Sequence, residues 1–324
     1  MREVEFATEF WEMKTPFTIT GHTFSGAEVL FVTLSENGCR GRGEGSGVYY
    51  LDESGASMLE QAETVRRALQ DGLDREGLRE RLPAGGARNA IDCALWDLEA
   101  KLSGRSIWDL TGIEPRETIT FNTVGIDTPD NMAEAAHALD TPRIKVKLDD
   151  ETPVERIAAV RAARPDAQII VDVNQGWNIE QLEELAPRLQ QLGVAMIEQP
   201  LPRGGDAALE GYRSPLPLCA DESCLHTGEF EQAAQRYQMI NIKLDKTGGL
   251  TEALDLAALA RANGIGLMVG NMMGTSLAMA PGYVVAQLCR FADLDGALFL
   301  KQDRANAMAC HGGILESPGR ALWG

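Results

Sequence analysis

The last two thirds of the chain repeat one pattern, a short apolar run followed by an amphipathic stretch. The runs start roughly 25 residues apart, and each has the length of a buried strand. They read TITFNTV at 118–124, RIKVKL at 143–148, QIIVDVN at 168–174, AMIEQP at 195–200, LCADES at 218–223, MINIKLD at 239–245, GLMVGN at 266–271 and FADLDG at 291–296. This pattern predicts eight strands.

The stretches between most of these runs have helical periodicity, as in TPVERIAAVRAARP at 152–165 and TEALDLAALARANG at 251–264. A strand that alternates with a helix indicates parallel βαβ units. Eight such units fit an α/β fold of the (β/α)8 type, a modified TIM barrel, better than an open sheet. The barrel predicts that functional side chains lie at the carboxyl ends of the strands.

The first third is mixed. Residues 2–11 and 27–34 are predicted strands, and ENG at 36–38 is a hairpin turn signal. Helices are predicted over 52–70 and 87–102, so this part is a compact α+β unit. We expect an α+β capping domain at 1–115 and a barrel domain at 116–324 whose C-terminal tail returns to the cap. The glycine-rich GRGEGSG at 41–47 is interpreted as a turn-rich loop.

Composition narrows the function classes. The formal net charge of −18 argues against nucleic acid and anionic membranes as partners, because both prefer a basic surface. The six cysteines form no CxxC pair and indicate free thiols in a reducing compartment. The N-terminus has no apolar signal-peptide core, and no apolar run is long enough to span a membrane. We expect a cytoplasmic protein, either monomeric or homo-oligomeric.

Two lysines alternate with apolar residues in RIKVKLD at 143–149. Alternate strand residues share one face, so Lys145 and Lys147 are predicted to lie side by side. One interpretation is a half-exposed strand with a solvated lysine face. The other is a pair of lysines that depress each other's pKa, so that one can act as a base near neutral pH.

Three acids follow successive predicted strands: Asp172, Glu198 and Asp221. Hard carboxylate oxygens with no nearby histidine or cysteine suit Mg²⁺, with one ion expected per subunit. Asn174 and Glu222 follow at the same strand ends and are predicted to support these ligands. The alternative is three surface or ion-paired acids.

Lys147 and Lys243 end the second and sixth predicted strands, on opposite sides of a barrel. A substrate carboxylate bound to the metal would have one lysine on each face. One lysine can then remove the proton on the carbon next to the carboxylate, and the other can return it, with inversion.

These motifs resemble the enolase superfamily, its muconate-lactonising subgroup, and within that subgroup the dipeptide epimerases. The resemblance covers nearly the whole chain. It is carried by PAGGARNAIDCALWDLEAKLSG at 83–104, KVK at 145–147, VDVN at 171–174, IEQPLP at 197–202, ADES at 220–223, NIKLDKTGG at 241–249 and DLDG at 293–296. It implies an isomerase that inverts the C-terminal residue of a dipeptide, with L-Ala-D/L-Glu from murein-peptide recycling as the first choice.

The resemblance also implies residue roles. Lys147 and Lys243 would be the acid–base pair, and Lys145 would contact the substrate carboxylate. Asp172, Glu198 and Asp221 would bind Mg²⁺. Substrate contacts are implied for Asp293 and Asp295, which would bind the dipeptide ammonium, and for Thr123 and Asn271.

One loop departs from the family pattern. Relatives that act on L-Ala-D/L-Glu supply an arginine near residue 20 for the glutamate side chain, whereas this loop reads TITGHTFSGAE. His22 could serve when protonated, and Phe24 would favour an apolar side chain. An epimerase of apolar dipeptides is therefore an alternative. Others are a cycloisomerase, an o-succinylbenzoate synthase-type lyase, and a sensor barrel that binds metal and ligand without catalysis.

Overall fold

The computed structural model describes residues 1–19 and 22–324, without the side chains of Phe17, Ile19 and His22. Eight parallel strands form one sheet in the order β12-β11-β10-β9-β8-β7-β6-β5. Their bounds are β5 Asn122–Val124, β6 Arg143–Lys147, β7 Gln168–Asp172, β8 Val194–Glu198, β9 Leu218–Ala220, β10 Met239–Ile242, β11 Gly266–Val269 and β12 Phe291–Ala292. Each overlaps one of the eight predicted runs, in sequence order, and only β8 extends beyond its run, by Val194.

The sheet closes into a barrel. Thr120 forms a parallel bridge with Ala292, and the Phe121 amide donates to the Ala292 carbonyl at 2.8 Å, which joins the two ends of the sheet. The interior is filled by seven buried side chains: Phe121, Ile170, Met196, Cys219, Met239, Met268 and Phe291. This layer is a packed core, as expected for a barrel of eight strands, and the barrel prediction is confirmed.

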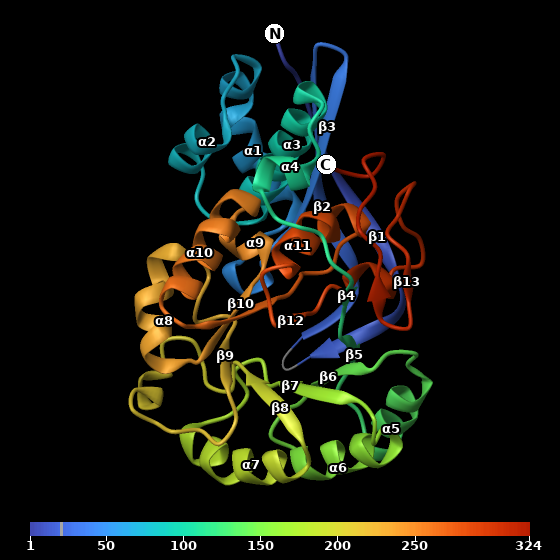
Figure 1. Cartoon of the computed structure of the whole chain (residues 1–324), viewed down its shortest axis with the longest axis vertical. Helices are drawn as coiled ribbons and strands as arrows, with labels where there is room; N and C mark the ends of the chain where they lie inside the picture. The colour runs from blue at the N-terminus through green and yellow to red at the C-terminus, as the bar shows by residue number, and fades with distance from the viewer. Residues whose placement is uncertain (20–21) are drawn as a thin grey trace.

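Helices cover the outside of the barrel (Figure 1). They are α5 Pro129–Ala138, α6 Pro153–Ala163, α7 Ile179–Gln191, α8 Phe230–Arg236, α10 Leu250–Ala262 and α11 Ser276–Ala286. Two strands are followed only by short 3₁₀ turns, η2 Ala207–Leu209 after β8 and η4 Gly296–Phe299 after β12. The alternation is therefore incomplete, which is why the structure is a modified (β/α)8 barrel.

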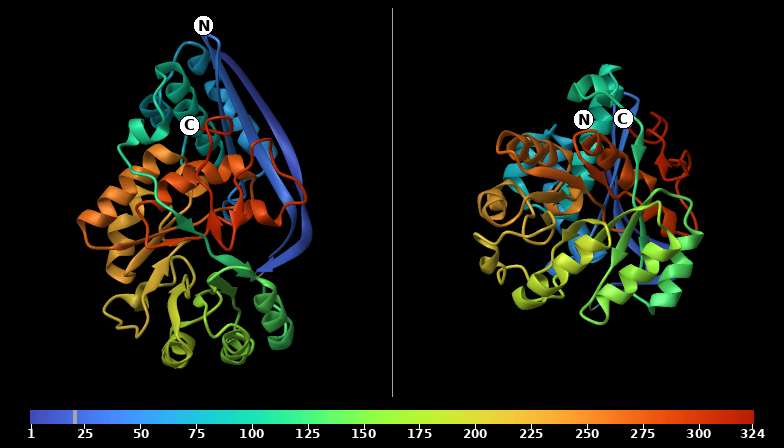
Figure 2. Two further views of the ribbon diagram at one scale, coloured as in Figure 1. Left: turned by 45° about the vertical axis from the view of Figure 1, so that its right-hand side comes forward. Right: turned by 60° about the horizontal axis from the view of Figure 1, so that its bottom comes forward.

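A long hairpin runs beside the barrel (Figure 2). It consists of β1 Glu3–Ile19 and β2 His22–Glu36, and both strands are longer than predicted. β2 continues into β3 Cys39–Ser46 through Asn37 and Gly38, both with positive φ. Two such residues between paired strands are typical of a tight hairpin turn, so the ENG turn prediction is confirmed.

The segment at 41–47 is mostly strand β3, so its interpretation as a turn-rich loop was wrong. Its glycines alternate along the strand and face α3 Gly86–Ser103. A Cβ on Gly43 would lie 2.0 Å from the Ala90 carbonyl oxygen, and one on Gly45 would lie 2.2 Å from that of Gly86. The strand backbone therefore lies directly against the helix, which only glycine permits.

The remaining cap helices are α1 Gly55–Gln70, α2 Arg75–Arg81 and α4 Ile107–Thr111, with η1 Tyr49–Leu51 before α1. The C-terminal residues pack against α3: the Trp323 indole donates to the Cys93 carbonyl at 2.9 Å, and the Gly324 amide donates to Asp97 at 2.7 Å. A small antiparallel sheet joins β4 Thr118–Ile119 with β14 Ile314–Leu315 and β13 Cys310–His311.

A single short helix, α9 Leu244–Thr247, follows β10 directly. It ends at Gly248 and Gly249, both with positive φ. The Arg88 guanidinium of α3 donates to the carbonyls of Thr247 and Gly248 at 2.5 and 3.1 Å, so the cap holds this turn against the barrel. None of the helices in the described part of the chain is long and apolar enough to cross a membrane.

Candidate active site

Three predicted site residues lie next to one another at the carboxyl ends of β6, β7 and β8. Lys147 pairs in register with Asp172, and Asp172 pairs with Glu198, each at the last position of its strand. Asp221 and Lys243 come directly after β9 and β10. The polar residues of these strand ends therefore meet at one rim of the barrel, as the barrel predicts.

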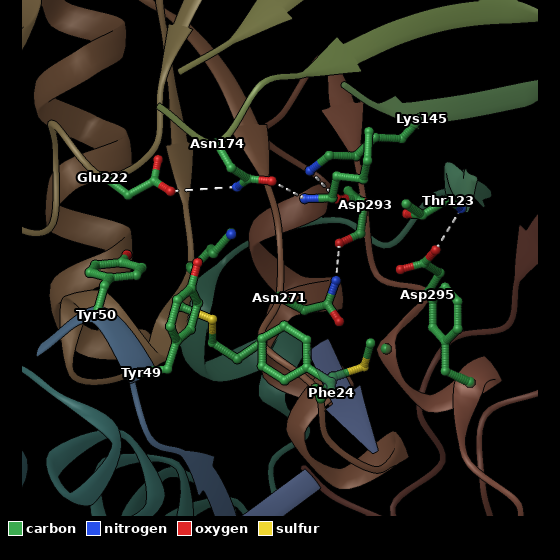
Figure 3. A pocket seen from close by; sticks show the side chains of 16 residues that line it. Phe24, Tyr49, Tyr50, Thr123, Lys145, Asn174, Glu222, Asn271, Asp293 and Asp295 are labelled. Atoms are coloured by element: carbon green, nitrogen blue, oxygen red, sulfur yellow. Dashed lines mark hydrogen bonds and ion pairs between the residues drawn. The ribbon is translucent and has the colours of Figure 1, made fainter. Parts of the chain in front are cut away.

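A cavity with about 590 Å³ of empty space lies between this rim and the cap (Figure 3). Its lining includes ten predicted site residues: Phe24, Thr123, Lys145, Lys147, Asn174, Glu222, Lys243, Asn271, Asp293 and Asp295. The three predicted metal ligands are fully buried next to the lysines. The prediction for the His22 side chain falls outside the described residues.

Lys145 lies at the centre of the charged cluster. Its ammonium nitrogen is 3.0 Å from Asp172, 2.8 Å from Glu198 and 2.8 Å from Asp293, and its side chain is buried. Burial alone would lower the pKa of Lys145, but the charges of these acids outweigh it and hold the pKa well above its usual value. The interpretation of this strand as half-exposed with a solvated lysine face is therefore wrong. The expectation that the pKa of Lys145 is lowered is also wrong.

The two lysines of the predicted acid–base pair each contact a different acid. The Lys147 ammonium donates to Asp172 at 2.6 Å and to the Asn174 side-chain oxygen at 2.9 Å. The Lys243 ammonium donates to Asp221 at 2.7 Å. Burial again opposes the charge of Asp221 at Lys243, yet the pKa of Lys243 is raised. Both lysines reach the cavity from strands that are four positions apart in the sheet.

The three predicted metal ligands lie among the ammonium groups of the lysines. As the side chains stand, the described residues contain no group of three or more His, Cys, Asp or Glu that could hold a metal ion, because the ammonium groups lie among the carboxylates. The donor set nevertheless fits a divalent cation. All three carboxylates are fully buried, and among the described residues the buried Glu198 Oε2 has no hydrogen-bond donor besides the Lys145 ammonium that it pairs with at 2.8 Å. Oxygen donors of this kind are those that Mg²⁺ prefers.

Burial would raise the pKa of Asp172, but Lys145 and Lys147 lower the pKa to about 2. By contrast, burial and the charges of Asp172 and Asp221 raise the pKa of Glu198 against the pull of Lys145. The cluster therefore holds acids with unequal affinity for protons, and further positive charge would favour ionisation of all three.

Asp293 and Asp295 lie on the Thr123 side of the cavity, away from Glu222 (Figure 3). One oxygen of Asp293 pairs with Lys145, and the other, Oδ1, is buried and has no hydrogen-bond partner among the described residues. Asp295 accepts the Thr123 amide at 2.8 Å. The Asn271 amide donates to the Asp293 carbonyl at 2.6 Å. This corner of the cavity presents acceptor oxygens and suits a cationic group.

The opposite wall is largely apolar and was mostly missed from the sequence. It contains Tyr49, Tyr50, Met272, Met273 and Phe299 beside the predicted Phe24. The rings of Phe24 and Tyr49 meet edge to face, with their centroids 5.5 Å apart. The buried Tyr50 hydroxyl makes no hydrogen bond within the part of the chain that the structure describes. No arginine lines this cavity among the residues that the structure describes.

Comparisons with known proteins identify the family. The description "Mandelate racemase / muconate lactonizing enzyme, N-terminal domain" matches residues 1–112, and "Enolase C-terminal domain-like" matches residues 129–310. The chain is 48% identical over 307 residues to the L-Ala-D/L-Glu epimerase of Escherichia coli K12, covering 94% of this chain and 96% of the relative. It is also 40% identical to the N-acetyl-D-glutamate racemase of a Pseudoalteromonas species, covering 91% and 95%.

Two solved structures have the same fold. An Agrobacterium tumefaciens enolase family member with homology to dipeptide epimerases, with bound sodium and L-Ala-L-Glu, has a TM-score of 0.97 at 39% identity, covering all of both chains. The dipeptide epimerase of Enterococcus faecalis V583, complexed with Mg and L-Leu-L-Tyr, has a TM-score of 0.91 at 27% identity, covering 97% and 96%. The chain belongs to the mandelate racemase and muconate lactonizing enzyme family of the enolase superfamily.

Proposed function

We propose that the protein is a Mg²⁺-dependent dipeptide epimerase that inverts the α-carbon of the C-terminal residue, with L-Ala-D/L-Glu as the first-choice substrate. The observation that carries the proposal is the pair of buried lysines, Lys147 and Lys243, on opposite sides of a cluster of three carboxylates. The family relatives support the reaction type, since the 48% identical protein is an L-Ala-D/L-Glu epimerase.

In this proposal Asp172, Glu198 and Asp221 hold the metal ion. When bound, Mg²⁺ stabilises negative charge on the substrate carboxylate. Because the acids at the rim now raise the pKa of Lys243, Lys243 would give up its proton more readily once their charge is offset by a bound cation.

Proton transfer is then the work of two lysines. Lys147 or Lys243 removes the α-proton as a neutral amine, and the carbanion is delocalised into the carboxylate as an enediolate. The opposite ammonium returns a proton to the other face, which inverts the centre. Lys145 contributes positive charge to the same carboxylate.

The other end of the dipeptide is bound by Asp293 and Asp295. The unpartnered Oδ1 of Asp293 is an acceptor for the substrate ammonium, and Asp295 adds a second carboxylate. Thr123 and Asn271 line the cavity beside them. A dipeptide thus has its ammonium at the acidic corner and its carboxylate at the metal cluster.

A second candidate is an epimerase of dipeptides with an apolar C-terminal side chain. The specific observation is the wall of Phe24, Tyr49, Met272, Met273 and Phe299, without an arginine among the described residues. A glutamate side chain would need a charge-assisted partner, and the buried Tyr50 hydroxyl is a neutral donor in this region.

The test is α-proton exchange. The protein is incubated with Mg²⁺ in D₂O with L-Ala-L-Glu, L-Ala-L-Leu, L-Ala-L-Phe and N-acetyl-L-Glu, and deuterium at the α-carbon is measured by NMR and mass spectrometry. The fastest exchange with L-Ala-L-Glu would support the first choice, and exchange only with the apolar dipeptides would reassign the substrate. Exchange with none of the dipeptides would overturn the epimerase proposal.

We also propose the division into a cap at 1–115 and a barrel at 116–324, and a cytoplasmic location. The C-terminal residues, which contact α3, would then link the barrel back to the cap. The six cysteines form no disulfide among the described residues, which supports a reducing compartment.

A further inference from the structure

Each of the three carboxylates at the barrel rim has one oxygen held by a dedicated donor and one turned toward the lysines. For Asp172, Oδ1 accepts the Asn174 amide at 3.0 Å, while Oδ2 faces Lys145 and Lys147 at 3.0 and 2.6 Å. The same pattern, with one oxygen hydrogen-bonded and the other facing a lysine of the cavity, is found at Glu198 and Asp221.

Glu198 is held by Asn241 of β10. The Asn241 side-chain amide donates to Glu198 Oε1 at 2.6 Å, and Oε2 faces Lys145 at 2.8 Å. Asn241 is fully buried. A Cβ on Gly270 would lie 2.7 Å from the Asn241 amide nitrogen, so this glycine leaves the space that the amide occupies.

Asp221 is held by Lys246 of α9. The Lys246 ammonium donates to Asp221 Oδ1 at 2.5 Å, while Oδ2 faces Lys243 at 2.7 Å. Lys246 also donates to the carbonyls of Asp221 at 2.6 Å and Asn241 at 3.0 Å. Its side chain is buried, does not line the cavity, and is fully occupied by these acceptors.

We infer that Asn241 and Lys246 are positioning residues that hold Glu198 and Asp221 as one-oxygen ligands and thereby set the preference of the site for Mg²⁺ over Ca²⁺. The inference rests on the metal ion of the proposed function. With one oxygen of each acid engaged, three oxygens remain to face the ion: Asp172 Oδ2, Glu198 Oε2 and Asp221 Oδ2.

Three protein oxygens suit an octahedral ion that keeps its other coordination positions for water and substrate. Mg²⁺ is usually bound in this way. Ca²⁺ takes six to eight oxygens and accepts carboxylates through both atoms. When a donor is removed, the released oxygen can also turn toward the ion. This additional oxygen ligand should favour the binding of Ca²⁺ more than the binding of Mg²⁺.

The experiment uses the full chain, freed of metal with a chelator and studied without substrate. Asn241→Leu and Lys246→Met remove one donor each at similar side-chain size. Mg²⁺ and Ca²⁺ dissociation constants are measured by titration calorimetry, and Mn²⁺ binding is measured by electron paramagnetic resonance. Thr251→Val is the matched control, because Thr251 is buried where α10 meets α3 and bonds Asp92 and Trp96 rather than the three carboxylates.

We expect the two donor variants to weaken Mg²⁺ binding by about 10–100-fold. Their preference for Mg²⁺ over Ca²⁺ should fall by about tenfold or more, whereas Thr251→Val keeps the preference of the unaltered protein. A loss of structure alone would weaken both ions together, so the ratio of the two constants is the decisive readout.

An unchanged ratio in the folded donor variants would overturn the inference and leave the proposed function standing. If Lys246→Met does not fold, Asn241→Leu decides alone. Failure of the unaltered protein to bind Mg²⁺ would overturn both the inference and the metal part of the proposed function.

Discussion

The two sides of the cavity are built differently. On the barrel side, buried charges stand at strand ends, and Lys145, Lys147 and Lys243 each contact carboxylates at 3.0 Å or less. On the other side, the apolar wall combines Phe24 and Tyr49 of the cap with Met272 and Met273 of the loop after β11, so its residues come from distant segments. The comparison teaches that reaction chemistry and side-chain recognition depend on different side chains, so each can be changed alone.

The largest effect should follow loss of either lysine of the proposed pair. Lys147→Ala and Lys243→Ala should each lower kcat for epimerisation by about 10²–10⁴-fold, because each removes one proton carrier. Each variant should still exchange the α-proton of one epimer, and the two variants should prefer opposite epimers. Steady-state polarimetry and NMR in D₂O measure both properties.

The control for the lysine variants is Arg67→Ala, an exposed residue of α1 that pairs with Asp71. It should leave kcat unchanged. Equal loss of exchange for both epimers in both lysine variants would contradict a lysine on each face.

A smaller effect should follow Asp295→Asn, which tests the acidic corner. Loss of one charge-assisted contact should raise KM for a dipeptide by about tenfold or more. The measurement compares L-Ala-L-Xaa with the matching N-acetyl amino acid, which lacks the ammonium. If KM for both substrates rose equally, the ammonium role of Asp295 would be wrong.

The same residue should give a pH dependence. Burial and the charge of Asp293 raise the pKa of Asp295 to about 7. As pH falls below 7 the carboxyl gains a proton and no longer attracts an ammonium, so KM for dipeptides should rise and level off near the value of Asp295→Asn. KM measured from pH 5.5 to 8.5 should lose this dependence in Asp295→Asn; a dependence that persists there belongs to another group.

The smallest effect, and the one that separates the two sides most sharply, should come from Phe24→Arg. A guanidinium on the cap wall offers a carboxylate partner, so the ratio of kcat/KM for L-Ala-L-Glu over L-Ala-L-Leu should rise by about tenfold. Since the lysines are untouched, α-proton exchange at saturating L-Ala-L-Leu should change little. Phe24→Leu is the control for loss of the ring alone; a matching rise in that variant would refute the charge argument.

The sequence predicted the barrel side well because its signals are local. Each strand is a continuous apolar run, and the residue after it is fixed at the rim by the direction of a parallel strand. Lys147, Asp172 and Glu198 could therefore be placed from spacing alone. The ion pairs of Lys145 could not be predicted from spacing, because its three acidic partners follow three different strands. Only the fold sets the distances between them.

The apolar wall of the cavity and the neighbouring strand β3 could not be predicted in the same way. Met272 and Met273 stand in no periodic pattern that separates a cavity wall from a packed core. The strand at β3 was missed because alternate glycines carry no apolar signal and weaken strand propensity. Its stability depends on α3, which lies more than forty residues further along the chain.

That strand also governs how the protein can change over generations. Gly43 and Gly45 leave no room for a Cβ beside α3, so almost any mutation there collides with helix backbone. The side chain between them points the other way, where Glu44 accepts the amide and hydroxyl of Thr275 at 2.7 and 2.6 Å. Side chains larger than glycine are thus accommodated only on the face of the strand away from α3, and that face borders the loop that carries the cavity methionines.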